Sequence, residues 1–258
     1  MDLRKTTVDW AQWLRRWDRQ QTGYLPYREE RFTVAVDVLE QVLAGTAEPV
    51  IVDLGCGPGS FSQRIVERLP TARCLAVDLD PVLLALGRAA LGDAGGRITW
   101  IQADLMSVHL PAVLGVSTVD AVVSSTALHW LSAERLSATY TQLGGLVRRG
   151  GLFLNADNIP EPGEATVLPR MAERARAEAI ERSVAAGGED WSTWWEALAE
   201  QPGIAGLISE RRELFAGITR DWAEPALDFH VAALRYAGFG EVGVPWQRLD
   251  DRVLLAVR

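Results

Sequence analysis

Short apolar runs alternate with helical patterns along most of the 258-residue chain. Between the runs, apolar residues recur three or four positions apart, as in helices with one buried face. This alternation predicts a parallel sheet with helices on both faces. The runs that read as buried strands are residues 50–54, 74–77, 97–102, 119–123 and 152–156, and a helix over 227–234 precedes two more strands at 241–244 and 253–257.

The N-terminal part of the chain lies outside this alternation. Trp10, Trp13 and Trp17 share one face of a short helix. A polar link containing a turn then leads to a second helix that stops near Gly45. The aromatic face can pack the helix onto the domain or, as part of a lid, border a ligand. We predict a helical lid over residues 1–45 and a main domain over residues 46–258.

From about residue 159 to residue 225 the alternation breaks again, which predicts a helical insertion. One amphipathic helix is expected over residues 168–179, and a second helix carries Trp191 and Trp195 on one face. This aromatic face either packs the insertion onto the domain or forms the wall of a pocket for an apolar or aromatic substrate. Trp246 follows a predicted strand and either reaches the same pocket or covers a sheet edge.

A glycine-rich turn follows the first predicted strand, where the chain reads Asp53-Leu54-Gly55-Cys56-Gly57-Pro58-Gly59. Glycine is needed where φ is positive or where a ligand must approach the main chain without a Cβ in the way. The third glycine comes one position earlier than in the G-x-G-x-x-G motif of dinucleotide-binding proteins. A tight strand-to-helix turn without a ligand is the alternative interpretation.

Acidic residues follow the second and third predicted strands. Asp78 stands where a carboxylate can accept hydrogen bonds from both hydroxyls of a ribose. Asp80 and Pro81 are expected to be the N-cap and first residue of the next helix. Asp104 follows the third strand, where a lone aspartate is usually a cap. The placement of Asp78 suits an adenosine-containing ligand.

At these residues the chain resembles the class I S-adenosylmethionine-dependent methyltransferases, over residues 50–155. The resemblance implies an α/β fold: a Rossmann-like three-layer α/β/α sandwich with a seven-stranded, mostly parallel sheet whose last strand is antiparallel. It also implies S-adenosyl-L-methionine as cofactor. Asp78 would hold the ribose, and Tyr24 and Arg28 the carboxylate of the methionine end, although a salt bridge to Glu29 or Glu30 is an equal alternative for Arg28. The other cofactor-binding candidates are Asp53, Gly55, Cys56, Gly57, Leu79, Asp104, Leu105 and Ser124.

The loop after the fourth strand indicates the kind of acceptor. It lacks the Asn/Asp-Pro-Pro-Tyr motif of the family's nucleic-acid amino-methyltransferases, and its Ala-Leu-His-Trp-Leu form is similar to the small-molecule branch, in particular to trans-aconitate methyltransferases. His129 in this loop is the catalytic candidate, because imidazole accepts a proton near neutral pH. It would position or deprotonate the acceptor, or else only shape the loop. The candidate substrate contacts are Trp17, His129, Trp191, Trp195 and Trp246.

Composition narrows the class of protein further. The formal net charge of −8 argues against a nucleic-acid partner. No run of apolar residues is long enough to predict a membrane span. Cys56 and Cys74 fall in the predicted core and are expected to be reduced thiols, as in a cytoplasmic protein. Three scattered histidines give no metal-ligand spacing. The expected partner is a small molecule, apolar or aromatic, and the sequence leaves the oligomeric state open.

These observations favour methyl transfer from S-adenosylmethionine to an O, N or C nucleophile of a small metabolite. One alternative keeps the cofactor without methylation, as a binding protein or as an enzyme of another reaction such as cyclisation. A less favoured alternative is a nicotinamide-dependent oxidoreductase, which the early third glycine disfavours.

Overall fold

The computed structural model describes residues 3–105, 109–163, 166–218 and 224–258. Its centre is a seven-stranded sheet with the order β3-β2-β1-β4-β5-β7-β6. β1 to β5 run parallel to one another, whereas β7 is antiparallel to both β5 and β6. The predicted sheet is confirmed. Its strands are β1 (Val50–Leu54), β2 (Arg73–Asp78), β3 (Ile98–Gln102), β4 (Val119–Ser125), β5 (Val147–Asn158), β6 (Glu241–Arg248) and β7 (Asp251–Val257).

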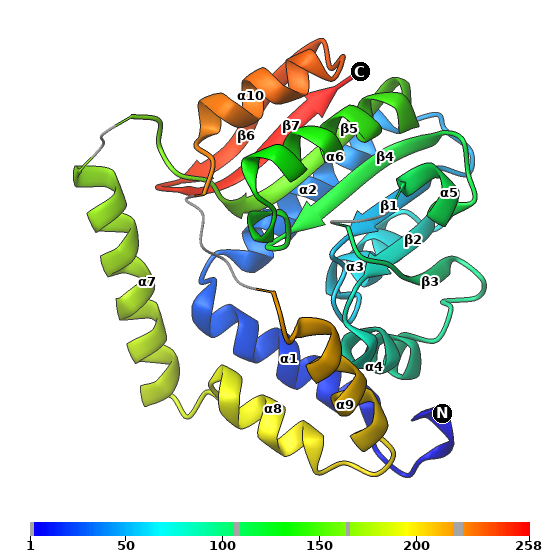
Figure 1. Ribbon diagram of the computed structural model, residues 1–258, viewed down its shortest axis with the longest axis vertical. Helices are drawn as coiled ribbons and strands as arrows, with labels where there is room; N and C mark the ends of the chain where they lie inside the picture. Colours follow the sequence, from blue (N-terminus) through cyan, green and yellow to red (C-terminus); the bar gives the residue numbers. More distant parts are fainter. Residues whose placement is uncertain (1–2, 106–108, 164–165, 219–223) are drawn as a thin grey trace.

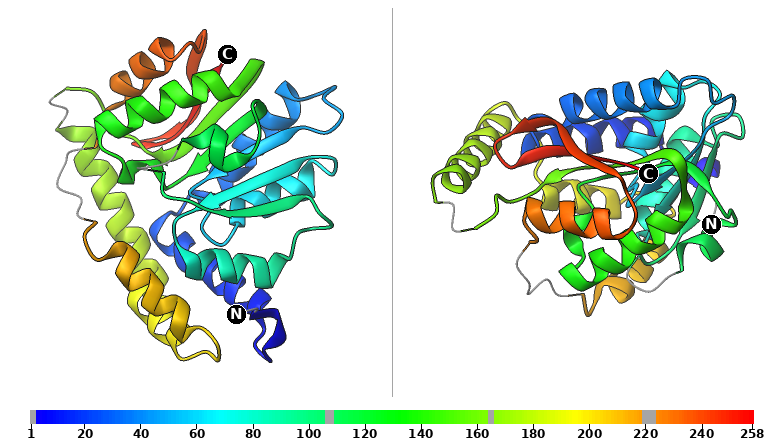
Figure 2. Two further views of the ribbon diagram at one scale, coloured as in Figure 1. Left: turned by 45° about the vertical axis from the view of Figure 1, so that its right-hand side comes forward. Right: turned by 90° about the horizontal axis from the view of Figure 1, so that it is seen from above.

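Helices cover both faces of this sheet, which gives three layers (Figure 2). One face is covered by α2 (Arg28–Val42), α3 (Ser60–Arg68) and α4 (Pro81–Leu91). The other face is covered by α5 (Leu110–Leu114), α6 (Ala133–Leu146) and α10 (Leu227–Tyr236). Strands buried on both faces need apolar side chains in either direction, which accounts for their nearly continuous apolar sequences.

A further group of helices lies beside the sandwich: α1 (Trp10–Tyr24), α7 (Val167–Ala185), α8 (Trp191–Ala199) and α9 (Ala205–Phe215) (Figure 1). Trp10, Trp13 and Trp17 of α1 are buried together with Trp194 of α8 and apolar residues of α4. The insertion thus packs on the N-terminal helix rather than on the sheet. It holds three helices where the sequence predicted two, and residues 164–165 and 219–223 of the predicted insertion lie outside the described residues. None of the helices in the described part of the chain is long and apolar enough to cross a membrane.

α2 belongs to the helical layer and not to a lid. Phe32, Val36 and Leu39 are buried against the sheet in one cluster with Phe61 of α3. Removing α2 would therefore expose the core. The segment that we continue to propose as a lid is narrower than residues 1–45 and consists of α1 together with the insertion.

Two element boundaries differ from the sequence prediction for physical reasons. α1 continues into the predicted link as far as Tyr24, and Gly23 lies within it as a packing position: a Cβ there would lie 2.7 Å from Ser183 Oγ of α7. β5 begins at Val147 rather than at the predicted residue 152, so Arg148 and Arg149 lie in a strand. The charge on Arg148 is satisfied there, since its Nε donates to Asp120 at 2.6 Å.

Two adjacent glycines in α6 allow a matched test of the packing between α6 and α10. A Cβ at Gly144 would lie 1.9 Å from the carbonyl oxygen of Ala237, whereas a Cβ at Gly145 would meet nothing within 4 Å. We expect Gly144→Ala to lower the free energy of unfolding by about 1–3 kcal/mol or more through overpacking. Gly145→Ala should raise it by about 1 kcal/mol through helix propensity. Urea denaturation of both variants measures this, and equal effects would contradict the packing described.

Candidate active site

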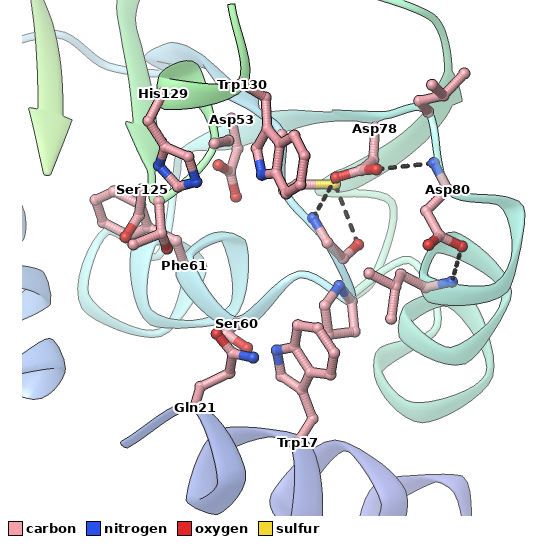
Figure 3. Close-up of a pocket in the computed structure, with 18 of the residues that line it drawn as sticks. Trp17, Gln21, Asp53, Ser60, Phe61, Asp78, Asp80, Ser125, His129 and Trp130 are labelled. Atoms are coloured by element: carbon pink, nitrogen blue, oxygen red, sulfur yellow. Dashed lines mark hydrogen bonds between the residues drawn. The ribbon is translucent and has the colours of Figure 1, made fainter. Parts of the chain in front are cut away.

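A cavity of about 740 Å³ opens at the carboxyl edge of the parallel strands. Its wall combines the turns after β1, β2, β3 and β4 with side chains from α1, α8 and α9. In the close-up, Asp78 and Asp80 lie on one side, His129 and Trp130 on another, and Trp17 and Gln21 reach in from α1 (Figure 3). The carboxyl edge of an open parallel sheet is the usual place for a ligand site.

The glycine turn forms the floor of the cavity. Gly55, Gly57 and Gly59 have φ values of 71°, 54° and 84°, which side chains rarely adopt. A Cβ at Gly55 would lie 2.2 Å from the Cβ of Ala127, so this glycine also permits close packing of the β1 and β4 turns. A Cβ at Gly57 would come no closer than 3.9 Å to a neighbour. The space above Gly57 is therefore part of the cavity, where a ligand can approach the main chain.

Asp78 is held in place by the main chain of two turns. Its carboxylate accepts from the N–H of Gly57 at 2.7 Å and from the N–H of Asp80 at 2.8 Å. Burial raises the pKa of Asp78 to about 6, against these two hydrogen bonds. Asp53, behind the glycine turn, accepts from the backbone and hydroxyl of Ser62. Burial raises the pKa of Asp53 to about 7. A ligand that donates hydrogen bonds or carries positive charge would thus stabilise the ionised form of both carboxylates.

Asp80 caps α4 as predicted, because it accepts from the N–H groups of Val82 and Leu83. Its second oxygen accepts from the Nε of Arg211 on α9, at 2.6 Å. This contact joins the insertion to the turn that carries Asp78.

His129 lies in a short 3₁₀ helix, Leu128–Trp130, which follows β4. Its Nδ1 is 2.9 and 3.1 Å from the two carboxylate oxygens of Asp157 at the end of β5. Burial alone would raise the pKa of Asp157, but His129 and the charge of Arg31 outweigh it and hold this pKa below its ordinary value. An ionised partner at Nδ1 leaves the Nε2 atom to act as a proton acceptor.

The backbone around His129 is strained in a way that fixes the loop. Thr126, at the end of β4, has a φ of 51°, a conformation that a β-branched residue rarely adopts. Its N–H donates to the carbonyl of Ala156 at 3.1 Å. Leu128 and Leu131, on either side of His129, are buried. Such strain is retained where the surrounding contacts impose it, so the imidazole is held at a defined position on the cavity wall.

Tyr24 and Arg28 line the end of the cavity near α1. Arg28 is buried, and its guanidinium donates to Asp18 at 2.8 Å, with Glu29 3.6 Å away. Burial lowers the pKa of Arg28, against the attraction of Asp18. The salt bridge to Glu29 considered as an alternative is therefore present, although Asp18 is the nearer partner. Tyr24 accepts through its hydroxyl from the N–H of Trp191 at 3.0 Å.

Most of the predicted site residues meet in this one cavity. Three do not line it. Ser124 is fully buried and donates to the carbonyl of Leu54, Trp195 packs under Arg211, and Trp246 lies on β6 against Tyr27. The predicted residues that line the cavity are Trp17, Tyr24, Arg28, Asp53, Gly55, Cys56, Gly57, Asp78, Leu79, Asp104, Leu105, His129 and Trp191.

Asp157, the partner of His129, was not foreseen from the sequence. It follows Asn155 in the polar end of β5, and polar residues at that edge of the sheet were a usable signal. His230, on α10, is buried away from this cavity, and its Nδ1 lies 2.6 Å from the hydroxyl of Tyr140. Sequence reasoning also missed several lining residues with polar or aromatic side chains: Gln21, Ser60, Ser125, Trp130, Asn158 and Arg211.

The chemistry of the cavity fits an adenosyl cofactor. Asp78 offers carboxylate oxygens, Leu79 and Leu105 offer an apolar wall, and Gly57 leaves the main chain accessible. The buried hydroxyl of Ser125 has no hydrogen-bond partner within the described ranges of the chain, although it lies on the cavity wall. A buried polar atom of this kind is stabilised when a ligand satisfies it.

Comparison with known proteins agrees with this geometry. Residues 51–151 match the family described as a methyltransferase domain. A trans-aconitate 2-methyltransferase of Methylobacterium nodulans is 30% identical over 186 residues, which are 69% of this chain and 66% of the relative. One of Azoarcus is 39% identical over 115 residues, which are 45% of this chain and 41% of the relative. The match thus spans 41% to 66% of the length of these relatives.

Solved structures share the fold. Magnesium protoporphyrin IX methyltransferase from Synechocystis, with bound S-adenosylhomocysteine, has a TM-score of 0.58 at 16% identity, covering 95% of this chain and 94% of that chain. An O-methyltransferase family protein from Burkholderia thailandensis has a TM-score of 0.55 at 18% identity, covering 87% of this chain and 55% of that chain. With the strand order, the glycine turn, the aspartates after β2 and β3 and the matching relatives, the chain is a member of the class I S-adenosylmethionine-dependent methyltransferases.

Proposed function

We propose that this protein transfers the methyl group of S-adenosylmethionine to a nucleophile of a small metabolite, with His129 as the residue that faces the acceptor. The observation that carries the proposal is that His129, paired with the buried Asp157, lies on the wall of the same cavity as Asp78. A proton acceptor and a ribose-binding carboxylate in one cavity suit a group transfer in which the acceptor must lose a proton.

The residues of the chain have three tasks: they bind the cofactor, orient the acceptor and take up its proton. Asp78 would accept from the ribose, Leu79 and Leu105 would enclose the adenine, and Asp104 would accept from its amino group. Tyr24 and Arg28 lie toward the methionine end. When bound, the cofactor supplies an electrophilic methyl group on a sulfonium. The protein's main contribution is then to hold the acceptor in line at near-attack distance, which can account for several kcal/mol of the barrier.

Asp157 orients the imidazole of His129 through Nδ1, so that Nε2 receives the proton of an acceptor hydroxyl or amine. A nucleophile that arrives already deprotonated would need no such base. The pairing of His129 with a buried ionised carboxylate supports a protonated acceptor, because such a partner stabilises the imidazolium that forms.

The acceptor is uncharged and aromatic or apolar. Both arginines on the described part of the cavity wall are paired: Arg28 with Asp18, and Arg211 with Asp80. Trp130 and Trp191 line the same cavity with 51% and 42% of their surface exposed, which offers flat apolar area to a ligand. A tricarboxylate such as trans-aconitate, named for the relatives above, would find acidic groups and no unpaired cation among these residues.

Two acceptors that differ only in charge test this preference: a naphthol, and the same ring system bearing a carboxylate. We expect the carboxylate to lower kcat/KM about tenfold or more, since an uncompensated buried charge costs more than about 1.4 kcal/mol. Titration of both compounds into the protein saturated with S-adenosylhomocysteine measures the preference without turnover. Equal or better use of the carboxylated ring, or methylation of trans-aconitate, would contradict the proposed acceptor class.

The setting we propose is the cytoplasm, without a nucleic-acid or membrane partner. The cysteines Cys56 and Cys74 are buried, unpaired thiols, which a reducing compartment preserves. The net charge of −8 disfavours attraction to phosphate backbones. A fractionation that recovered the active protein with membranes or nucleic acid would contradict this setting.

A further inference from the structure

α9 of the insertion is joined to the cofactor end of the cavity by one arginine. The Nε of Arg211 donates to Asp80 at 2.6 Å, and its guanidinium lies over the ring of Trp195, 4.0 Å from the centroid, and 4.9 Å from that of Phe215. Arg211 and Phe215 both line the cavity. This arrangement uses the flat face of the guanidinium as well as its charge, which lysine could not reproduce.

Asp80 links this contact to the ribose-binding position. Its backbone N–H donates to Asp78 at 2.8 Å, and its carboxylate caps α4. The Asp80 side chain is only 4% exposed, and burial raises its pKa against the attraction of Arg211. Arg211 therefore contacts Asp80, which in turn contacts Asp78, the carboxylate proposed to bind the ribose. The positive charge of Arg211 neutralises that of Asp80.

The rest of α9 is weakly held. No residue within α9 is buried completely. Leu207 and Ile208 pack at the edge of the cluster that includes Val82 of α4, and the N-cap residue Ile204 is buried in that cluster. On the exposed side, Glu210 accepts from the side-chain amide of Gln102 at 3.1 Å. A helix with few buried apolar contacts opens at low free-energy cost. Ile204 anchors the start of α9, and the ion pair of Arg211 with Asp80 ties the side of the helix that lines the cavity.

We infer that α9 closes over the cofactor and that Arg211 is the positioning residue that holds it closed. The cofactor binds tightly only to the protein in which α9 is closed. The apparent dissociation constant of the cofactor therefore increases as the fraction of closed protein falls. The inference rests on the proposed cofactor site at Asp78. It assigns to the insertion a role in retaining the cofactor, in addition to forming part of the wall of the acceptor pocket.

The test compares Arg211→Gln with Arg212→Gln, because the neighbouring Arg212 has the same charge but is exposed and lies off the cavity. The probe is S-adenosylhomocysteine, studied by calorimetry and by stopped-flow displacement. Arg211→Gln should weaken its affinity about tenfold or more, chiefly through a faster dissociation rate. Arg212→Gln should match the wild-type protein in both. Phe215→Ala, which leaves the partner of Asp80 in place, should also accelerate dissociation.

The outcomes separate the inference from the proposed function. If the wild-type protein fails to bind S-adenosylhomocysteine, the proposed function is wrong and the inference falls with it. If the wild type binds but Arg211→Gln and Phe215→Ala dissociate at the wild-type rate, only the inference is overturned. A loss of thermal stability in Arg211→Gln without a change in dissociation rate would likewise assign Arg211 a purely structural role. Should Arg211→Gln fail to fold, Phe215→Ala decides the question.

Discussion

Replacing His129 with asparagine is expected to lower turnover by about 10²–10⁴-fold, the usual contribution of a general base. Affinity for the cofactor should stay nearly constant, because we propose that His129 faces the acceptor, and its partner is Asp157 rather than Asp78. The loss should shrink as pH rises, since an acceptor that is already deprotonated needs no base. Steady-state kinetics between pH 6 and pH 9, with cofactor affinity measured in parallel, checks both parts of this expectation.

The matched control is His109→Asn, the same substitution at an exposed histidine that precedes α5 and does not line the cavity. It should leave both turnover and affinity unchanged. Full turnover in His129→Asn would end the catalytic assignment. A parallel loss of cofactor affinity and rate would instead place His129 in the cofactor-binding wall.

Asp78→Ala should weaken cofactor binding by about 10- to 150-fold. Hydrogen bonds to a charged partner contribute about 1.5–3 kcal/mol, and each 1.4 kcal/mol is about tenfold in affinity. The fold should tolerate the change, because the carboxylate accepts from two turn N–H groups that face the cavity region and can bind water instead. Calorimetry with S-adenosylhomocysteine measures the effect, and an unchanged affinity in a folded variant would remove Asp78 from the ribose.

The raised pKa of Asp78 gives this prediction a pH dependence with a definite sign. With a folded-state pKa of about 6 against 3.8, the group's contribution to stability is fully present below pH 3.8 and is lost as pH rises through 6. The ionised carboxylate is thus costly in the free protein, and a ligand that donates hydrogen bonds to it should be bound more weakly as pH falls below about 6. Asp78→Asn should lack this part of the pH profile. A wild-type affinity that did not decrease between pH 7 and pH 5 would contradict it.

The α/β/α sandwich could be predicted because each of its strands and turns is specified by a short stretch of sequence. Each parallel strand is an apolar run buried on both faces, and the turn after β1 needs glycine at fixed positions. Position in this layout then determined the placement of Asp78 and Asp104, since strand ends of a parallel sheet meet at one edge. The cap at Asp80 followed from residue type alone.

Other features depend on contacts between distant segments. α9 has no completely buried residue, so its sequence carries no strong apolar period to reveal it. The sequence around Gly23 indicated a turn. In the structure Gly23 lies within α1, and α7 packs against it. Asp157 and His129 are 28 residues apart, and only the pairing of β4 with β5 brings their strand ends together. Ser124 was assigned from the resemblance, but the alternation of side chains along β4 directs its neighbour Ser125 to the cavity instead. For Trp246 the second alternative holds, since it lies on the edge strand β6 against Tyr27.

The most direct test of the account is to follow a deuterated methyl group from S-adenosylmethionine in a mixture of small metabolites treated with the protein. We expect mass spectrometry to find the label in an uncharged, hydroxyl- or amine-bearing aromatic compound, together with S-adenosylhomocysteine. The yield should drop strongly with His129→Asn and be unaffected by His109→Asn. Cofactor that is bound but never demethylated, or cleaved without a labelled acceptor, would contradict methyl transfer as the function of this site.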